Sequence, residues 1–169
     1  AFENKHKGVL PPLSRGVRQL TLGAGGSGKT FMYENVWKPV FEAFLTGDRA
    51  LGASNAVARL IKGDTMHSAM RLRADSRLQV HALAPHGPML NSMVDDWKPV
   101  QALLLEEISM WPPSWLYALG VRLQHVRRAA GKPGVDPRMP LVKSYGGIAQ
   151  VNQTGDFFLS LIHISEPTR

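Results

Sequence analysis

The stretch Gly23–Thr30, GAGGSGKT, decides the fold of this chain. It has the spacing of a phosphate-binding loop, in which a glycine is followed by four residues and then by Gly-Lys-Thr. Its glycines allow the backbone to wrap closely around a phosphate with the N–H groups pointing inward. The stretch lies between the expected strand 17–22 and a helical pattern that begins at Lys29. This order of strand, loop and helix favours a phosphate-binding loop over an ordinary glycine-rich turn.

The polar groups of this stretch have separate predicted roles. The following helix presents its N-terminal partial positive charge to the bound anion. Lys29 is placed to reach the β- and γ-phosphates of a nucleotide, and the Thr30 hydroxyl is placed to ligate Mg²⁺. The predicted nucleotide-binding residues are Gly23, Gly25, Gly26, Ser27, Gly28, Lys29 and Thr30.

A phosphate-binding loop needs an acidic partner on a neighbouring strand, to hold the metal ion and to activate a water molecule. The apolar run Ala102 to Leu105 is followed directly by Glu106 and Glu107. Ligands of open parallel sheets bind at the carboxyl ends of the strands, where this pair would lie. We predict Glu106 as a metal ligand and Glu107 as the residue that positions or deprotonates water. Without the loop, the pair would also fit a solvent-facing acid pair before the helix near Trp111.

Strand and helix patterns alternate along the chain, which predicts an α/β fold with a parallel sheet and helices on its faces. Strands are expected at 17–22, 100–105 and 148–156. Helical patterns occur at 29–45, with a bend or break near Pro39, and at 54–61 and 112–130. Segments 81–93 and 131–140 are rich in Pro and Gly, and we interpret them as an excursion and a loop.

Composition sets the outer bounds on function. A length of 169 residues fits one domain. The formal charge of +7 favours polyanionic partners such as nucleic acid or nucleotides, although solvated basic faces give the same balance. The chain has no cysteine, which excludes disulfides, thiolate zinc sites and thiol nucleophiles. No apolar run approaches the roughly 18 residues of a membrane span, so we expect an intracellular protein without a membrane partner.

Four motifs together carry a family resemblance. They are GAGGSGKT (23–30), SNAVARLIKGDTMHSAMRL (54–72), LLLEEISM (103–110) and YGGIAQVNQTGDFF (145–158). In this order, over roughly 17–158, they resemble the first motor domain of the petite-integration-frequency DNA helicases of superfamily one. The resemblance implies a RecA-like P-loop NTPase domain, a three-layer sandwich with a parallel sheet. It also implies an ATP-dependent enzyme that unwinds DNA in the 5′-to-3′ direction, with ATP and Mg²⁺ as cofactors.

The resemblance further implies roles for individual residues and for the parent protein. Asp156 lies in the motif that senses the γ-phosphate. The residues placed where the family contacts single-stranded DNA are Ser54, Asn55, Thr65, His67 and Ser68. Taken alone, His67 fits a structural histidine better. The parent would be a monomer acting in DNA repair, recombination or telomere maintenance, in the nucleus or the mitochondrion.

Two features depart from the family pattern. Glu106 stands where the family usually has aspartate, and its extra methylene would alter an octahedral Mg²⁺ site. Polar residues interrupt strands that should be buried on both faces; they are Arg18, Gln19, Gln150, Asn152 and Gln153. Either these strands are more exposed than in the family, or the sequence has drifted.

The last 11 residues, Leu159 to Arg169, do not continue the family pattern. They match, residue for residue, the translation of a transposase adaptor used to prepare sequencing libraries. We therefore expect a leader at 1–16, an incomplete first RecA-like domain at 17–158 and an artefactual tail at 159–169. The alternative is a natural amphipathic tail. Because the resemblance places the arginine finger in a second motor domain, we expect the isolated chain to be inactive and to bind nucleotide weakly at most.

Two other functions remain open from the sequence. One is a different P-loop ATPase or a nucleotide kinase, although a kinase needs lid arginines over its acceptor and none is evident. The other is a non-enzymatic, degenerate helicase remnant, which Glu106 and the polar strand residues favour.

Overall fold

The computed structural model describes residues 17–45, 47–72, 85–131 and 144–156. The expected leader at 1–16 and the expected tail at 159–169 lie outside the described residues. Most of the expected loop at 131–140 lies outside them as well.

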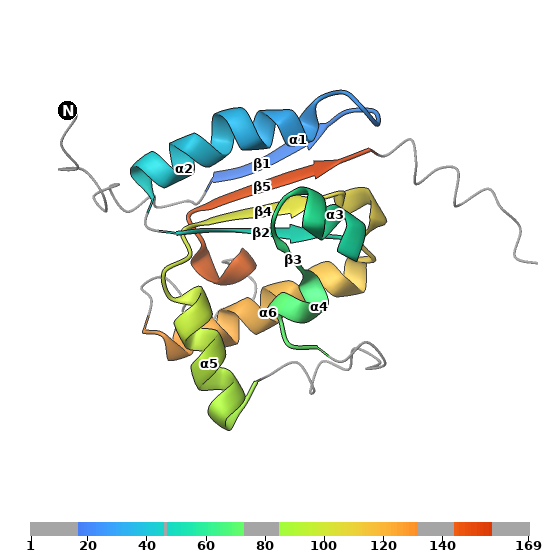
Figure 1. Ribbon diagram of the computed structural model, residues 1–169. Coiled ribbons are helices and arrows are strands. Elements are labelled where there is room, and N and C mark those ends of the chain that lie inside the picture. The colour runs from blue at the N-terminus through green and yellow to red at the C-terminus, as the bar shows by residue number, and fades with distance from the viewer. Residues whose placement is uncertain (1–16, 46, 73–84, 132–143, 157–169) are drawn as a thin grey trace, which may run out of the picture.

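A parallel sheet forms the centre of the described structure (Figure 1). Its five strands are β1 (Val17–Leu22), β2 (Asp48–Gly52), β3 (Asp64–Thr65), β4 (Ala102–Glu106) and β5 (Gln150–Gly155). They are arranged in the order β1-β5-β4-β2-β3, and every neighbouring pair is parallel. The predicted fold class is therefore confirmed.

Helices cover both faces of this sheet. They are α1 (Lys29–Met32), α2 (Lys38–Phe44), α3 (Asn55–Leu60), α4 (Met66–Ala69), α5 (Gly87–Trp97) and α6 (Pro113–Ala129). Shorter helical turns are η1 (Tyr33–Trp37), η3 (Ile108–Met110) and η4 (Ser144–Gly147). In Figure 1, α1 and α2 run along one side of the sheet, whereas α5 and α6 lie on the other. Among the described residues, none of the helices has the length and apolar character needed to cross a membrane.

The three layers follow from the alternation of side chains in β4. Ala102 and Leu104 pack with Tyr33, Phe41 and other buried residues beneath α1 and α2. Leu103 and Leu105 belong to the larger core that α4, α5 and α6 cover. Because helices cover both faces, every residue of β4 is buried, which is typical of a parallel strand.

The polar residues of β1 and β5 lie in different environments. Strand β1 lies at the edge of the described sheet and is largely exposed, so Arg18 and Gln19 are not in a central strand. Strand β5 is central, and its polar side chains are partly satisfied, since Asn152 Nδ2 is buried without a hydrogen-bond partner among the described residues. Asn152 is fully buried and accepts a hydrogen bond of 2.6 Å from Gln150 Nε2. Gln153 Nε2 donates to the Tyr145 hydroxyl at 2.7 Å.

The helical segment does not break near Pro39 but changes helix type just before it. The chain from α1 to α2 is continuous in Figure 1, but η1 between them is π-helical. The N–H of Lys38 donates to the carbonyl of Tyr33, five residues earlier. Pro39 then follows in the first turn of α2, where the absence of an N–H is tolerated.

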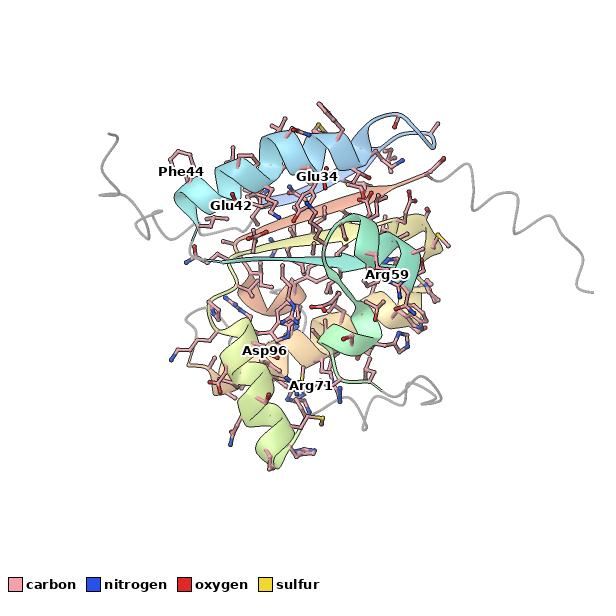
Figure 2. All side chains as sticks on the ribbon, viewed as in Figure 1. Glu34, Glu42, Phe44, Arg59, Arg71 and Asp96 are labelled. Carbon is pink, nitrogen blue, oxygen red and sulfur yellow. The ribbon has the colours of Figure 1, made fainter. Side chains whose placement is uncertain are left out.

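Helix α5 differs from the sequence expectation. Residues 81–93 were expected to form an excursion, but Gly87–Trp97 is an α-helix. Pro88 occupies its first turn, a position that favours proline, and Trp97 is fully buried against the core. An ion pair of 2.7 Å between Arg71 and Asp96 connects this helix to the segment after α4 (Figure 2).

Strand β2 was not expected at all, because it begins with the charged pair Asp48 and Arg49. Both side chains find partners only in the folded chain. Asp48 Oδ2 accepts a hydrogen bond of 3.4 Å from the hydroxyl of Tyr33. Arg49 forms an ion pair of 2.7 Å with Asp64, and its guanidinium lies 4.7 Å from the centre of the Trp97 ring.

Candidate nucleotide-binding site

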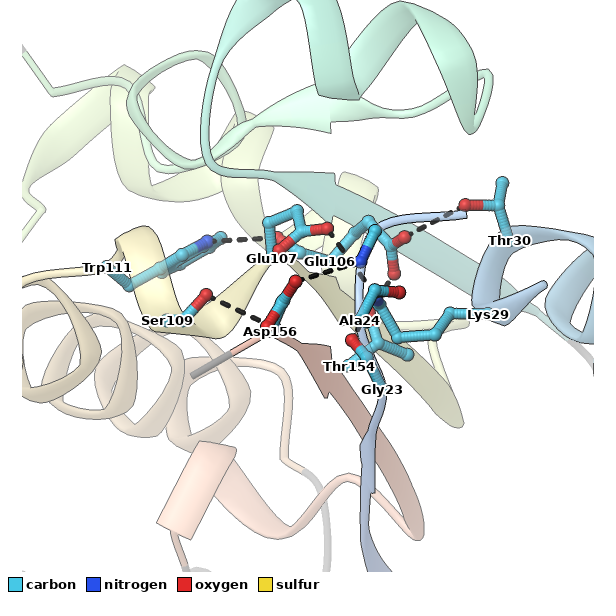
Figure 3. Close-up of polar contacts among 11 residues, drawn as sticks. Gly23, Ala24, Lys29, Thr30, Glu106, Glu107, Ser109, Trp111, Thr154 and Asp156 are labelled. Carbon is cyan, nitrogen blue, oxygen red and sulfur yellow. Dashed lines mark hydrogen bonds and ion pairs between the residues drawn. The ribbon is translucent and has the colours of Figure 1, made fainter. Parts of the chain in front are cut away.

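The candidate site lies where three adjacent strands end. The glycine-rich loop follows β1, Asp156 follows β5, and Glu106 is the last residue of β4. Since these strands are parallel and neighbours in the order β1-β5-β4, their carboxyl ends meet at one edge of the sheet (Figure 3). Ligands of open parallel sheets bind at this edge.

The loop has the backbone that its glycines predict. Gly26 and Gly28 have φ angles of 76° and 88°, in the left-handed region that glycine adopts without strain. Gly28 is the N-cap of α1, so the helix begins at Lys29. A Cβ atom at Gly23 would lie 2.4 Å from the Ser27 hydroxyl oxygen, so a larger residue there would require the Ser27 side chain to move.

Lys29 is buried within the loop that precedes it. Its Nζ atom donates to the carbonyl oxygens of Gly23 and Ala24, at 2.7 and 3.1 Å. The same atom lies 3.9 Å from Oε1 of Glu107. The ammonium group is thus held between the loop and the acidic pair, beside the amides that the loop presents.

Two hydroxyl groups hold the carboxylate of Glu106. Thr30 Oγ1 donates to Glu106 Oε1 at 3.0 Å, and Thr154 Oγ1 donates to Glu106 Oε2. Glu106 is only 2% exposed. A hydroxyl and a carboxylate are oxygen ligands of the kind that Mg²⁺ prefers when nucleotide phosphates and water complete its shell. Thr30 and Glu106 therefore fit the predicted magnesium site.

Among the described residues there is no group of three or more His, Asp or Glu side chains that could hold a metal ion by themselves. A nucleotide-dependent Mg²⁺ site does not require such a group, because the phosphates supply part of the coordination.

Glu107 lies at a sharp turn between β4 and η3. Its φ of 56° is left-handed, which is uncommon for a residue other than glycine and occurs at functional sites. One carboxylate oxygen, Oε1, faces Lys29. The other, Oε2, is buried and has no hydrogen-bond partner within the part of the chain that the structure describes. This oxygen is available to accept a hydrogen bond from water, as the predicted role requires.

Asp156 links the end of β5 to the glycine-rich loop. Its Oδ2 atom accepts a hydrogen bond of 2.8 Å from the N–H of Gly25. Its own N–H lies 3.4 Å from the Ser109 hydroxyl oxygen, to which it donates. Asp156 therefore joins the ends of β1, β4 and β5 at the point where a phosphate would be bound.

The predicted DNA-binding residues lie at the same edge of the sheet, beyond β4. Gly52 of β2 is paired with Thr65 of β3, so the starts of α3 and α4 are close together. Two of the five side chains cap helices. Ser54 and Thr65 cap these helices by accepting hydrogen bonds from the N–H groups of Val57 and Ser68.

The remaining three residues differ in exposure. The ring of His67 contacts that of Trp115 edge-on, with centroids 4.5 Å apart, which fits the structural role that His67 has when taken alone. The side chains of Asn55 and Ser68 are exposed.

Sequence reasoning missed Thr154 and Ser109, which contact Glu106 and Asp156. Their only signal was position: Thr154 lies two residues before Asp156, and Ser109 two residues after Glu107. Neither position indicates a partner, since the contacts depend on how the strands are paired.

In this parallel sheet the glycine-rich loop follows β1, and the carboxylate of Glu106 ends β4, which is separated from β1 by the single strand β5. This arrangement defines a RecA-like P-loop nucleotide-binding domain. The family model described as PIF1-like helicase matches residues 14–169. The chain belongs to this family.

Solved structures agree on the fold. A Pif1 helicase from Candida albicans superposes with a TM-score of 0.61 at 20% identity, over 85% of this chain and 30% of that one. A Bacteroides Pif1 bound to single-stranded DNA gives 0.59 at 23% identity, over 86% and 29%. A Bacteroides sp Pif1 in complex with ADP-AlF4 gives 0.58 at 22% identity, over 85% and 29%. This chain thus spans less than a third of these relatives. No curated protein matches it.

Proposed function

We propose that this chain is part of an ATP-dependent DNA helicase and carries its nucleotide-binding motor domain. The observation that supports this most is the hydrogen bond of 3.0 Å between Thr30 and Glu106, which brings the glycine-rich loop and the acidic strand end into one site. Membership of the PIF1-like helicase family agrees with this function. Relatives of the same fold have been solved with ADP-AlF4 and with single-stranded DNA.

The proposed chemistry assigns one task to each group. The loop amides and Lys29 bind the β- and γ-phosphates. Thr30 and Glu106 hold the Mg²⁺ ion, which when bound neutralises charge on the phosphate oxygens. Glu107 orients the attacking water through its unpaired oxygen and accepts a proton from it. Asp156 senses the γ-phosphate, because a phosphate bound in the loop changes the hydrogen bond between Asp156 and the N–H of Gly25.

The proposed DNA track uses the exposed side chains near the starts of α3 and α4. Short polar groups and backbone amides hold the phosphates of a single strand without reading its sequence, which stepwise movement requires. Asn55 and Ser68 are exposed there, and the exposed Arg59 on α3 adds a positive charge (Figure 2).

We further propose movement in the 5′-to-3′ direction, a monomeric enzyme, and an intracellular role in repair, recombination or telomere maintenance. One related structure is described as two coordinating Pif1 helicases, so the oligomeric state needs its own measurement. For the isolated chain we propose weak nucleotide binding and little turnover. An arginine supplied by a second domain raises such rates by about 10³-fold or more.

The decisive experiment is ATP turnover by the intact parent protein, with and without single-stranded DNA. We expect DNA to stimulate turnover, and Lys29→Ala to abolish it because the charge at the phosphates is lost. Lys98→Ala is the matched control, since Lys98 is exposed at the opposite end of the domain. Turnover that DNA does not change would favour another P-loop ATPase or a kinase. Absence of nucleotide binding would favour a degenerate remnant.

A further inference from the structure

The family resemblance assigns no role to Thr154, yet this buried residue contacts the proposed metal site. It is fully buried, and its hydroxyl donates to Oε2 of Glu106. Thr30 donates to the other oxygen of the same carboxylate. Glu106 is therefore held from two sides by hydroxyl groups of two different elements, β5 and α1.

The register of the sheet produces this contact. Leu104 of β4 is paired with Asn152 of β5, so Glu106 and Thr154 lie side by side two residues further on. Residues two apart in a strand point to the same face. Leu104 packs beneath α1 and α2, and Glu106 and Thr154 consequently face the same layer as Thr30.

The Thr154 hydroxyl can fix the rotamer of the long Glu106 side chain. A glutamate has one more rotatable bond than an aspartate, and fixing it in one rotamer has a larger entropic cost. A hydrogen bond to a charged carboxylate is roughly twice as strong as one between neutral groups, enough to select one rotamer. We propose that Thr154 is a positioning residue that holds Glu106 in the orientation in which it, together with Thr30, receives the nucleotide-bound Mg²⁺.

This proposal rests on the proposed function, because it assigns Glu106 to the metal. It also accounts for the departure from the family pattern. The glutamate reaches a partner on the neighbouring strand, so its extra methylene is matched by Thr154. An aspartate at position 106 would be too short to keep the same contact.

The test is calorimetric binding of ADP to the 169-residue chain, in Mg²⁺ and in excess EDTA. We expect Thr154→Val to weaken binding about tenfold in Mg²⁺, from the loss of one charge-assisted hydrogen bond. In EDTA its affinity should equal that of the unaltered chain. Thr154→Ser keeps the hydroxyl and should restore Mg²⁺-dependent binding.

Thr21→Val is the matched control for the same substitution. Thr21 of β1 is paired with Thr154, so it lies beside it on the same face of the sheet. Its affinity for ADP should not change in either buffer. Thr154→Ala provides the same comparison if Thr154→Val does not fold, which thermal melting without nucleotide will show.

A double-mutant cycle with Glu106→Asp completes the test. We expect Thr154→Val to have no Mg²⁺-dependent effect in the Glu106→Asp background, because the shorter carboxylate does not reach residue 154. Equal loss in both backgrounds, or equal loss in Mg²⁺ and EDTA, would overturn the proposal and leave the proposed function standing. If the unaltered chain binds ADP no better in Mg²⁺ than in EDTA, both the proposal and the magnesium site fail.

Discussion

The carboxylate of Asp156 accepts a hydrogen bond of 2.8 Å from the N–H of Gly25, although 131 residues separate them in the chain. This contact connects the end of β5 to the loop that β1 leads into. It also places a negative charge at an amide of the phosphate-binding loop. A phosphate bound in this loop, as we propose, would compete with this carboxylate for the same donor.

Replacing Asp156 with asparagine should strengthen nucleotide binding while lowering turnover in the intact parent. Removing one like charge near the phosphates is worth about 1 kcal/mol at the solvent-exposed limit, or about a fivefold gain in affinity. Equilibrium titration with ATP measures this. Asp95→Asn, on the exposed side of α5, is the control for charge alone. Weaker binding by Asp156→Asn would show instead that the carboxylate shapes the loop for its ligand.

Gly63 packs so closely that any side chain should destabilise the fold. A Cβ atom there would lie 2.3 Å from the carbonyl oxygen of Ala50 in β2. We expect Gly63→Ala to lower the free energy of unfolding by about 1–3 kcal/mol, the usual cost of overpacking. Gly120 in α6 is the control, because a Cβ atom there meets nothing within 4 Å. Gly120→Ala should raise stability by about 0.5–1 kcal/mol in the same urea titrations.

Arg127 should be required for folding although it is far from the nucleotide site. Its buried guanidinium donates to the carbonyl oxygens of Trp97, Val100 and Gly146, which connects α5, α6 and η4. Burial lowers the pKa of this group. Arg127→Met removes a donor from all three carbonyl groups and should cost about 3 kcal/mol, although the carbonyl of Trp97 still accepts a hydrogen bond from the N–H of Val100.

Two further variants make the Arg127 measurement specific. Arg127→Lys should recover little of the loss, because one ammonium group cannot reproduce the planar fork. Arg128→Met, at an exposed neighbouring position, should change stability by less than about 0.5 kcal/mol. Equal effects at the two positions would contradict a specific role for Arg127.

Deprotonation of the Tyr33 hydroxyl should make the free energy of unfolding fall at alkaline pH. Burial raises the pKa of its hydroxyl, and Asp48, which accepts a hydrogen bond from it, raises the pKa further. The folded state thus keeps a proton that the unfolded state loses above its ordinary pKa of 10.0. Stability from this group is complete below pH 10 and falls as the pH rises beyond it.

Urea unfolding at pH 8 and pH 11 measures this effect. Tyr33→Phe should show a smaller loss of stability between the two pH values than the unaltered protein. Tyr117→Phe, at an exposed position, should show the same loss as the unaltered protein. An identical pH dependence in the Tyr33→Phe variant would mean that other groups control alkaline unfolding.

Contiguous features of the site could be read from the sequence, because their chemistry depends on local spacing. The glycine-rich loop and the Glu106–Glu107 pair each occupy a few adjacent residues, and each follows a strand. The structure places both at one edge of the sheet, as expected. Strand β2 and helix α5 could not be read in this way. The first depends on partners for Asp48 and Arg49, and the second begins with Gly87 and Pro88, which usually mark a turn.

By itself, the sequence determined the α/β class, the phosphate-binding loop and the family, since these depend on residue order within short segments. Only the tertiary structure decided which side chains meet. Pairing of β4 with β5 brings Thr154 to Glu106 across 48 residues of sequence, and the same sheet brings Asp156 to Gly25. The register between parallel strands is set by packing of the whole sheet between its helices. No local pattern contains that information, and the contacts of Glu106 and Asp156 depend on it.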